Sequence, residues 1–257
     1  METIDINYLH LTIGLGLLLI PLYFLHYYRT GLIKKTLIAS TRMVAQLLFI
    51  GFYLNYLFEW NNPFINILWV LIMVLIAAQT ALKSTTLQSK IMMIPLIVSF
   101  SVAITLVGGY FLGVVMELDS VFNARYFIPI TGSLLGNMLS ANVIALNSYC
   151  DGLQRERQLY YYLLGNGATP HEAQMPFIRT ALIKSFSPTI AGMAVMGLVS
   201  LPGTMIGQIL GGSDPNVSIK YQIMILIINF AASMLAVILS IRLIGRKLFD
   251  DYGRLTN

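Results

Sequence analysis

Seven long apolar runs, separated by short polar stretches, constrain this sequence more than any other feature. Their approximate limits are 6–28, 36–58, 64–82, 91–115, 126–149, 187–212 and 219–244. A run of about 20 apolar residues has the length that an α-helix needs to cross the hydrocarbon core of a bilayer. Only 11% of the residues are charged, whereas soluble domains contain roughly a quarter. The sequence therefore predicts an all-α, polytopic membrane protein with about seven transmembrane helices.

The basic residues predict how these helices are oriented. Of the 16 Lys and Arg residues, all but Arg125 and Lys220 fall in or beside the first, third and fifth connections or near the C-terminus. Because basic loops stay in the cytoplasm, the N-terminus is expected outside and the C-terminus inside. The first run follows an acidic start and exceeds the length of a signal-peptide core, so it is expected to remain as a transmembrane helix.

The connection formed by residues 150–186 is far longer than the others. We expect one transmembrane domain over 1–257, with residues 150–186 as a cytoplasmic loop that contains two short helices, 153–164 and 171–184. Gly165 and Gly167 would end the first helix. Thr169 and Pro170 suit the N-cap and the first position of the second helix.

The motifs of common enzyme sites are missing from the sequence. It contains no G-x-x-x-x-G-K-[ST] phosphate loop, no H-E-x-x-H pair and no nucleophile elbow. We therefore assign no catalytic residue, no cofactor-binding residue and no metal ligand, and we expect neither an enzyme nor a nucleic-acid partner. The 13 methionines could supply soft thioether ligands, but we favour their interpretation as apolar filler. Among them are Met193, Met196, Met205 and Met224.

Polar side chains form a row on one helical face in each of two apolar runs. In hydrocarbon, such residues are costly unless they face a cavity or another helix. Pro202 adds a free acceptor beside the second row, because it cannot donate to the carbonyl of Leu198. On the residues alone, hydrogen bonds between helices and a lined path both remain open. The two rows are Ser133, Asn137, Ser140 and Asn147 in the fifth run, and Ser200, Thr204 and Gln208 in the sixth.

Glycines form two further rows beside the polar ones. Gly203, Gly207 and Gly211 are spaced four residues apart, and Gly132 and Gly136 repeat this spacing. Small residues at this spacing let two membrane helices approach closely, so both rows predict helix packing.

The second run carries a charged residue inside its apolar stretch. Arg42 and Gln46 share a helical face because they are four residues apart. Arg42 could extend along the helix to the cytoplasmic surface, or it could face the interior of the bundle and meet a substrate or a pairing partner. Both interpretations stay open.

Four segments resemble a known family. They are "GLVSLPGTMIGQILGGSDPNVSIKYQIMI" (197–225), "IPITGSLLGN" (128–137), "LLGNGATPHEA" (163–173) and "RMVAQLLFIGFYL" (42–54). Together they resemble FetB-type permeases, the membrane subunits of a bacterial ABC transporter linked to iron export, which are related to plant aluminium-tolerance permease subunits. The resemblance spans most of the chain, and its longest segment is specific.

The resemblance implies a homodimer of permeases in the cytoplasmic membrane of a bacterium, paired with two copies of a cytoplasmic ATPase that binds ATP and magnesium. The expected function is export of a metal ion or metal-linked solute, with iron as the expected metal. The "GATP" turn resembles the coupling loop of ABC permeases, although the run 160–162 is Tyr-Tyr-Tyr where many carry a Glu. The expected coupling residues are Tyr161, Tyr162, Gly167, Ala168, Thr169 and Pro170. The expected translocation path contains Arg42, Gln46, Ser133, Asn137, Ser140, Ser200, Pro202, Thr204 and Gln208.

Two other functions are weighed against this one. A stand-alone secondary transporter of a small solute often shows inverted repeats and acidic residues within its spans. No repeat is evident here and no acid lies in the middle of a run. A membrane scaffold without transport is the third interpretation, and measurements of intracellular iron would distinguish it.

Overall fold

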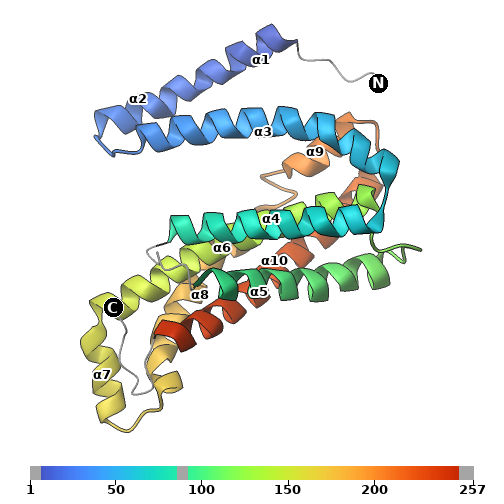
Figure 1. Ribbon diagram of the computed structural model, residues 1–257. Helices are drawn as coiled ribbons and strands as arrows, with labels where there is room; N and C mark the ends of the chain where they lie inside the picture. Colours follow the sequence, from blue (N-terminus) through green and yellow to red (C-terminus); the bar gives the residue numbers. More distant parts are fainter. Residues whose placement is uncertain (1–6, 86–91, 249–257) are drawn as a thin grey trace.

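The computed structural model describes residues 7–85 and 92–248, which form helices joined by short turns (Figure 1). In these ranges no strand occurs, apart from an isolated bridge between Met196 and Ser200. The expected all-α class is therefore confirmed. The elements are α1 (Tyr8–Leu15), η1 (Gly16–Leu18), α2 (Leu19–Tyr27), α3 (Ile33–Trp60), α4 (Pro63–Ser84), α5 (Met93–Ala103), the π-helical segments η3 (Ile104–Gly108) and η4 (Phe111–Val115), α6 (Ala124–Arg155), α7 (Arg157–Gly165), α8 (Pro170–Val195), α9 (Gly203–Leu210) and α10 (Pro215–Leu248).

Six helical segments among the described residues are long and apolar enough to cross a membrane. They are Leu9–Tyr27, Ile33–Trp60, Pro63–Ser84, Met93–Val115, Ala124–Arg155 and Pro215–Leu248. These segments correspond to six of the seven expected runs. Apolar length therefore located these helices, while the orientation of the termini stays a prediction.

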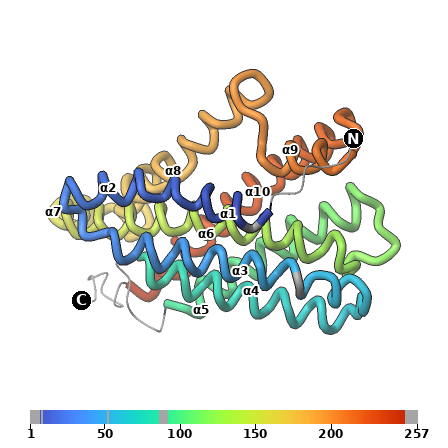
Figure 2. Tube along the Cα trace, turned by 90° about the horizontal axis from the view of Figure 1, so that it is seen from above, coloured from blue at the N-terminus to red at the C-terminus, as the bar shows by residue number. Residues whose placement is uncertain are grey.

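The expected run 187–212 is not a single helix. Its first part belongs to α8, which already begins at Pro170 and ends at Val195, and its last part is α9. The expected short helix 171–184 is therefore wrong in extent, because it continues into this run. Between α8 and α9, Gly197 has a φ of +87°, and its N–H donates to the carbonyl of Ser200 at 2.9 Å. Figure 2 shows α7 and α9 at opposite ends of the molecule, so α8, residues 196–202 and α9 run between these ends with a break between Val195 and Gly203.

Helices α4, α6 and α10, like α8 with its Thr169 cap, start at a side chain that satisfies a free backbone donor. Asn62 precedes α4, Asn123 precedes α6 and Asp214 precedes α10. The oxygen of each accepts a hydrogen bond from the backbone N–H two residues later, at 3.0, 3.1 and 2.8 Å respectively. An N-cap of this kind stabilises a helix by about 1 kcal/mol. The polar breaks before α4, α6 and α10 thus contain the residues that start these helices.

The core forms around α6, which packs against α4, α8 and α10, while α10 also packs against α5. Tyr149 of α6 is fully buried, and its hydroxyl donates to Oε1 of Gln174 on α8 at 2.9 Å. A Cβ added to Gly245 of α10 would lie 3.4 Å from each of these two oxygens. The three helices therefore meet closely at this point, near the α7 end of the molecule.

Helices α1 to α3 form an arm that stands apart from the core (Figure 1), and we call it the N-terminal arm. Leu47 and Phe49 of α3 are 62% and 66% exposed, although they point in directions about 200° apart around the helix. Neither side of α3 is therefore covered at mid-length within one chain. The arm meets the core through Leu57, which packs near Ala124 and Ile128 of α6.

Candidate functional site

A cavity of about 240 Å³ lies between α6, α8 and α10, and we call it the polar cavity. Hydroxyl and amide side chains from all three helices line it, together with apolar residues. Such groups are rare on the surfaces that membrane helices turn toward lipid, so their convergence on one cavity indicates a functional interior. The polar lining residues are Asn137 and Ser140 from α6, Ser185 and Thr189 from α8, and Asn229 and Ser233 from α10.

Hydrogen bonds fix the orientation of the polar groups on α6. Nδ2 of Asn229 donates to Oγ of Ser133 at 3.0 Å, which joins α10 to α6 beside the cavity. Nδ2 of Asn137 donates to the carbonyl of Ser133 at 2.9 Å, and the hydroxyl of Ser140 donates to the carbonyl of Gly136 at 3.1 Å. Because these donors are used on the backbone of α6, Asn137 and Ser140 can offer acceptor oxygens to the cavity. An uncharged cavity of acceptor oxygens suits a cation or a polyol.

A second cavity, of about 410 Å³, lies between the end of α8, residues 196–202, α9 and α10. We call it the methionine cavity, because Met193, Met196 and Met205 line it. It shares Met193 and Leu226 with the polar cavity. The α10 residues that line the polar cavity lie at 226–233, and those that line the methionine cavity lie at 219–227. The two cavities are therefore stacked along α10, with the methionine cavity nearer the α9 end.

The wall of the methionine cavity contains a hydrogen bond between two helices. The hydroxyl of Thr204 on α9 donates to Oε1 of Gln222 on α10 at 2.6 Å, and Gln222 is only 7% exposed. Pro202 also lines this cavity. Pro202 and Gln222 thus line this cavity, and Thr204 is joined to it through its bond to Gln222; a role for Pro202 and Thr204 in a translocation path stays a prediction.

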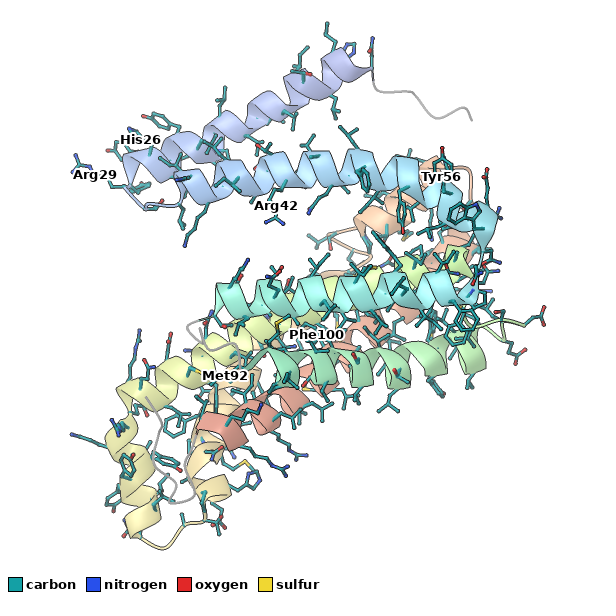
Figure 3. The ribbon with its side chains drawn as sticks, viewed as in Figure 1. His26, Arg29, Arg42, Tyr56, Met92 and Phe100 are labelled. Carbon is teal, nitrogen blue, oxygen red and sulfur yellow. The ribbon has the colours of Figure 1, made fainter. Side chains whose placement is uncertain are left out.

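The remaining expected path residues lie elsewhere. Ser200 is exposed in the segment between α8 and α9, and Gln208 is half-buried on α9. Arg42 and Gln46 are both exposed on the N-terminal arm. Figure 3 shows Arg42 extending from α3 on the side of α4. Asn147 belongs to the polar row of the fifth run but not to the expected path. It joins α6 to α4, because its Nδ2 donates to the carbonyl of Ser84 at 3.2 Å.

The glycine rows differ in what surrounds them. A Cβ on Gly132 would lie 3.3 Å from Cε of Met73, so α6 and α4 approach closely there. A Cβ added to Gly136, Gly203 or Gly207 would have no neighbouring atom within 4 Å outside its own helical turns. A Cβ added to Gly211 would contact only carbonyl oxygens of α9. Within the described part of one chain, no helix packs over the α9 glycines. Their role in helix packing stays a prediction.

The turn between α7 and α8 is built as the sequence predicts. Thr169 is the N-cap of α8, Pro170 is its first residue, and Gly167 has a φ of +90°. Glu172 completes a capping box that the sequence analysis did not identify: the N–H and the hydroxyl of Thr169 both donate to its carboxylate, at 2.8 and 2.7 Å. These bonds lower the pKa of the Glu172 carboxyl, and the bond from the backbone N–H of Thr169 has the largest effect. Ala168 is half-buried in the same turn.

The three tyrosines of α7 have different surroundings. Tyr160 is fully buried and Tyr162 is 66% exposed. Tyr161 is half-buried, and the guanidinium of Arg157 lies 5.4 Å from the centre of its ring. The exposed ring of Tyr162 and the turn at 167–170 thus lie at one end of the molecule, where a partner could reach them.

Four of the six polar residues that line the polar cavity were not expected from the sequence. Ser185 and Thr189 are four residues apart on α8, and Asn229 and Ser233 are four residues apart on α10, so periodicity could have found each pair. Gln222 lies seven residues before Asn229, on the same face. Among the described residues, no group of three or more His, Cys, Asp and Glu side chains could hold a metal ion.

Comparisons with known proteins agree with this architecture. A family model described as "Uncharacterised protein family (UPF0014)" matches residues 8–249. The chain is 32% identical to "Probable iron export permease protein FetB" of Escherichia coli (strain K12), over 99% of this chain and 97% of that protein. It is 31% identical to "UPF0014 membrane protein YjkA" of Bacillus subtilis (strain 168), over 91% and 93%. It is 32% identical to "Protein ALUMINUM SENSITIVE 3" of Arabidopsis thaliana, over 78% and 72%. No solved structure matches the chain.

Proposed function

The chain belongs to the UPF0014 family, a family of multi-pass membrane proteins, and from this membership we propose that it is the permease subunit of an ABC transporter. It would export a metal ion or a metal-linked solute, with iron as the expected metal, because its E. coli relative is named an iron export permease. Two copies of the chain would pair with two copies of a separate ATPase, and the ATPase would bind ATP and magnesium.

One observation carries this proposal: α8 joins the expected coupling turn to the polar cavity without interruption. The helix begins at Pro170, directly after the turn, and reaches the cavity at Ser185 and Thr189. From Pro170 to Thr189 it extends about 28 Å. A helix with this continuity can transmit a displacement of the turn to the lining of the cavity. ATP-driven movement of a partner at the turn would thereby change access to the polar cavity.

The contacts of α8 support such a transmission. The Tyr149–Gln174 hydrogen bond ties the first turns of α8 to α6, so a shift of α8 near the turn also acts on the helix that carries Asn137 and Ser140. Two-state movement of packed helices is an established way to couple distant sites. In one state the polar cavity would open to one side of the membrane, and in the other state it would open to the opposite side.

The test is ATP-dependent flux of iron through the permease reconstituted in proteoliposomes with its ATPase. We expect flux that needs ATP, and we expect Asn229→Leu to abolish it while the complex still assembles. Asn216→Ala is the matched control, because Asn216 is an exposed residue at the start of α10, away from the cavity. Flux that continues without ATP and without the ATPase would contradict the proposal and would favour a stand-alone secondary transporter.

A further inference from the structure

We propose that the methionine cavity is a binding site for a soft monovalent metal ion of the Cu(I) type, held by the thioether sulfurs of Met193, Met196 and Met205. This inference concerns binding by the chain itself and does not depend on coupling to an ATPase. It assigns a ligand chemistry to a cavity that is separate from the oxygen-lined polar cavity.

The three methionines converge on this cavity from separate segments. Met193 lies in the last turn of α8, Met196 is the residue directly after α8, and Met205 lies on α9. All three line one cavity of about 410 Å³, and Met205 is only 8% exposed. Each methionine side chain has three rotatable bonds, so the sulfurs can close around an ion that is smaller than the cavity. The break between α8 and α9 is what brings the three residues to the same place.

The three methionines of this cavity lie outside the main hydrophobic cluster. Met138 and Met92 are buried in that cluster, and Met234 packs against it. Among the described residues, Met193, Met196 and Met205 belong to neither hydrophobic cluster. Met193 and Met196 are half-buried, so their side chains are more accessible to a ligand than those of Met92 and Met138.

The lining of the methionine cavity also matches the charge of a monovalent ion. Thioether sulfur is a soft, uncharged donor that selects Cu(I) among biological metals, whereas Mg²⁺ and Ca²⁺ need carboxylates and other oxygen ligands. The cost of burying an ion in an apolar environment rises steeply with its charge. The lining contains no ionisable side chain; its one amide, from Gln222, accepts a hydrogen bond from Thr204. A monovalent soft ion therefore fits this lining better than an Fe²⁺ or Fe³⁺ ion.

The position of Met193 adds a connection to the polar cavity. Met193 lines both cavities, so an ion leaving the acceptor oxygens of Asn137 and Ser140 would next reach a wall that contains this side chain. The order of the two cavities along α10 thus places oxygen ligands before sulfur ligands on a route toward the α9 end.

The experiment measures Ag(I) binding to the full chain purified in detergent, because Ag(I) is an air-stable substitute for Cu(I). The titration uses a Cys150→Ala background, since Cys150 is the only cysteine and its thiol would compete. The cavity variant is Met193→Leu, Met196→Leu and Met205→Leu together. The control variant is Met73→Leu, Met116→Leu and Met234→Leu, which changes three partly buried methionines elsewhere. Met-to-Leu changes nearly conserve volume, so both variants should fold.

We expect one tightly bound Ag(I) per chain in the background and control proteins, and affinity lower by about 100-fold or more in the cavity variant. Should the triple variant fail to fold, the single variants Met193→Leu and Met196→Leu give the same comparison at half-buried positions. X-ray absorption of the Cu(I)-loaded protein should show sulfur neighbours that the cavity variant loses. Equal affinity in the cavity and control variants, or a Cu(I) ion with only nitrogen and oxygen neighbours, would overturn the proposal.

Discussion

The change Thr204→Val tests how α9 is held in place. This helix has eight residues, and Met205 is its buried residue. The hydroxyl of Thr204 donates to the buried Gln222 on α10 at 2.6 Å. Valine keeps the branched shape of threonine but removes the hydroxyl. The perturbation therefore deletes one hydrogen bond between α9 and α10 and leaves the amide oxygen of Gln222 without this donor.

The size of the effect follows from the value of such bonds between membrane helices. They contribute about 0.6 kcal/mol on average and up to about 1.7 kcal/mol. With an RT of about 0.59 kcal/mol at 25 °C, these values correspond to a population of detached α9 that rises by about 3-fold to about 20-fold.

Hydrogen exchange of the α9 amides, followed by mass spectrometry in detergent, measures this population. We expect exchange of residues 203–210 to accelerate by the same factor in Thr204→Val, while peptides from α4 stay unchanged. Thr80→Val is the control, because the hydroxyl of Thr80 donates to the carbonyl of Ile76 on its own helix at 2.7 Å. Unchanged exchange of α9 in Thr204→Val would refute the idea that this bond anchors α9, and so would equal acceleration in the control.

Two further predictions concern the turn between α7 and α8. Gly167→Val should weaken binding of the ATPase or uncouple hydrolysis from flux, because φ near +90° costs a β-branched residue about 1–2 kcal/mol or more. The control is Gly165→Ala, because Gly165 has no positive φ. Full coupling in Gly167→Val would contradict the prediction. The capping box should weaken in acid, since the pKa of Glu172 is lowered in the folded protein. Its contribution is complete above the ordinary carboxyl pKa and is lost as the pH falls through the lower folded value. Pepsin cleavage at this turn should therefore increase below about pH 4, and Glu172→Gln should lack this increase. Equal cleavage of the turn at every pH would contradict the link between the capping box and the charge of Glu172.

Apolar length was enough to predict most of the helices. A run that must cross about 30 Å of hydrocarbon has few ways to satisfy its backbone other than a helix. Side chains such as Asn62 and Asn123 then mark where the helices start. The run 187–212 failed this reasoning because hydropathy does not register backbone angles. Gly197 takes a positive φ there and Pro202 precedes α9, so the helix ends although the side chains remain apolar.

The candidate site was predictable only on one of its helices. The row on α6 is visible because Asn137 and Ser140 repeat at helical spacing. Pairs such as Asn229 and Ser233 are as regular, but short pairs of this kind are common in membrane helices that hydrogen-bond to one another. Which pairs converge depends on how α6, α8 and α10 pack, and that is a tertiary property. The methionine cavity was equally hidden in the sequence, since Met193 and Met205 line one cavity only because the helix breaks between Val195 and Gly203.

The N-terminal arm has a consequence for the order in which the chain is made and assembled. Helices α1 to α3 leave the ribosome first and bury little against the rest of their own chain. Each helix satisfies its backbone internally, so the arm can insert into the bilayer before α6 exists. The core, by contrast, must wait for α10, because the wall that carries Asn229 follows α8 and α9 along the chain. We therefore expect a nascent chain that stops after α3 to insert stably, and one that stops after α8 to carry an unfinished polar cavity that exposes Asn137 and Ser140 to lipid until α10 is made.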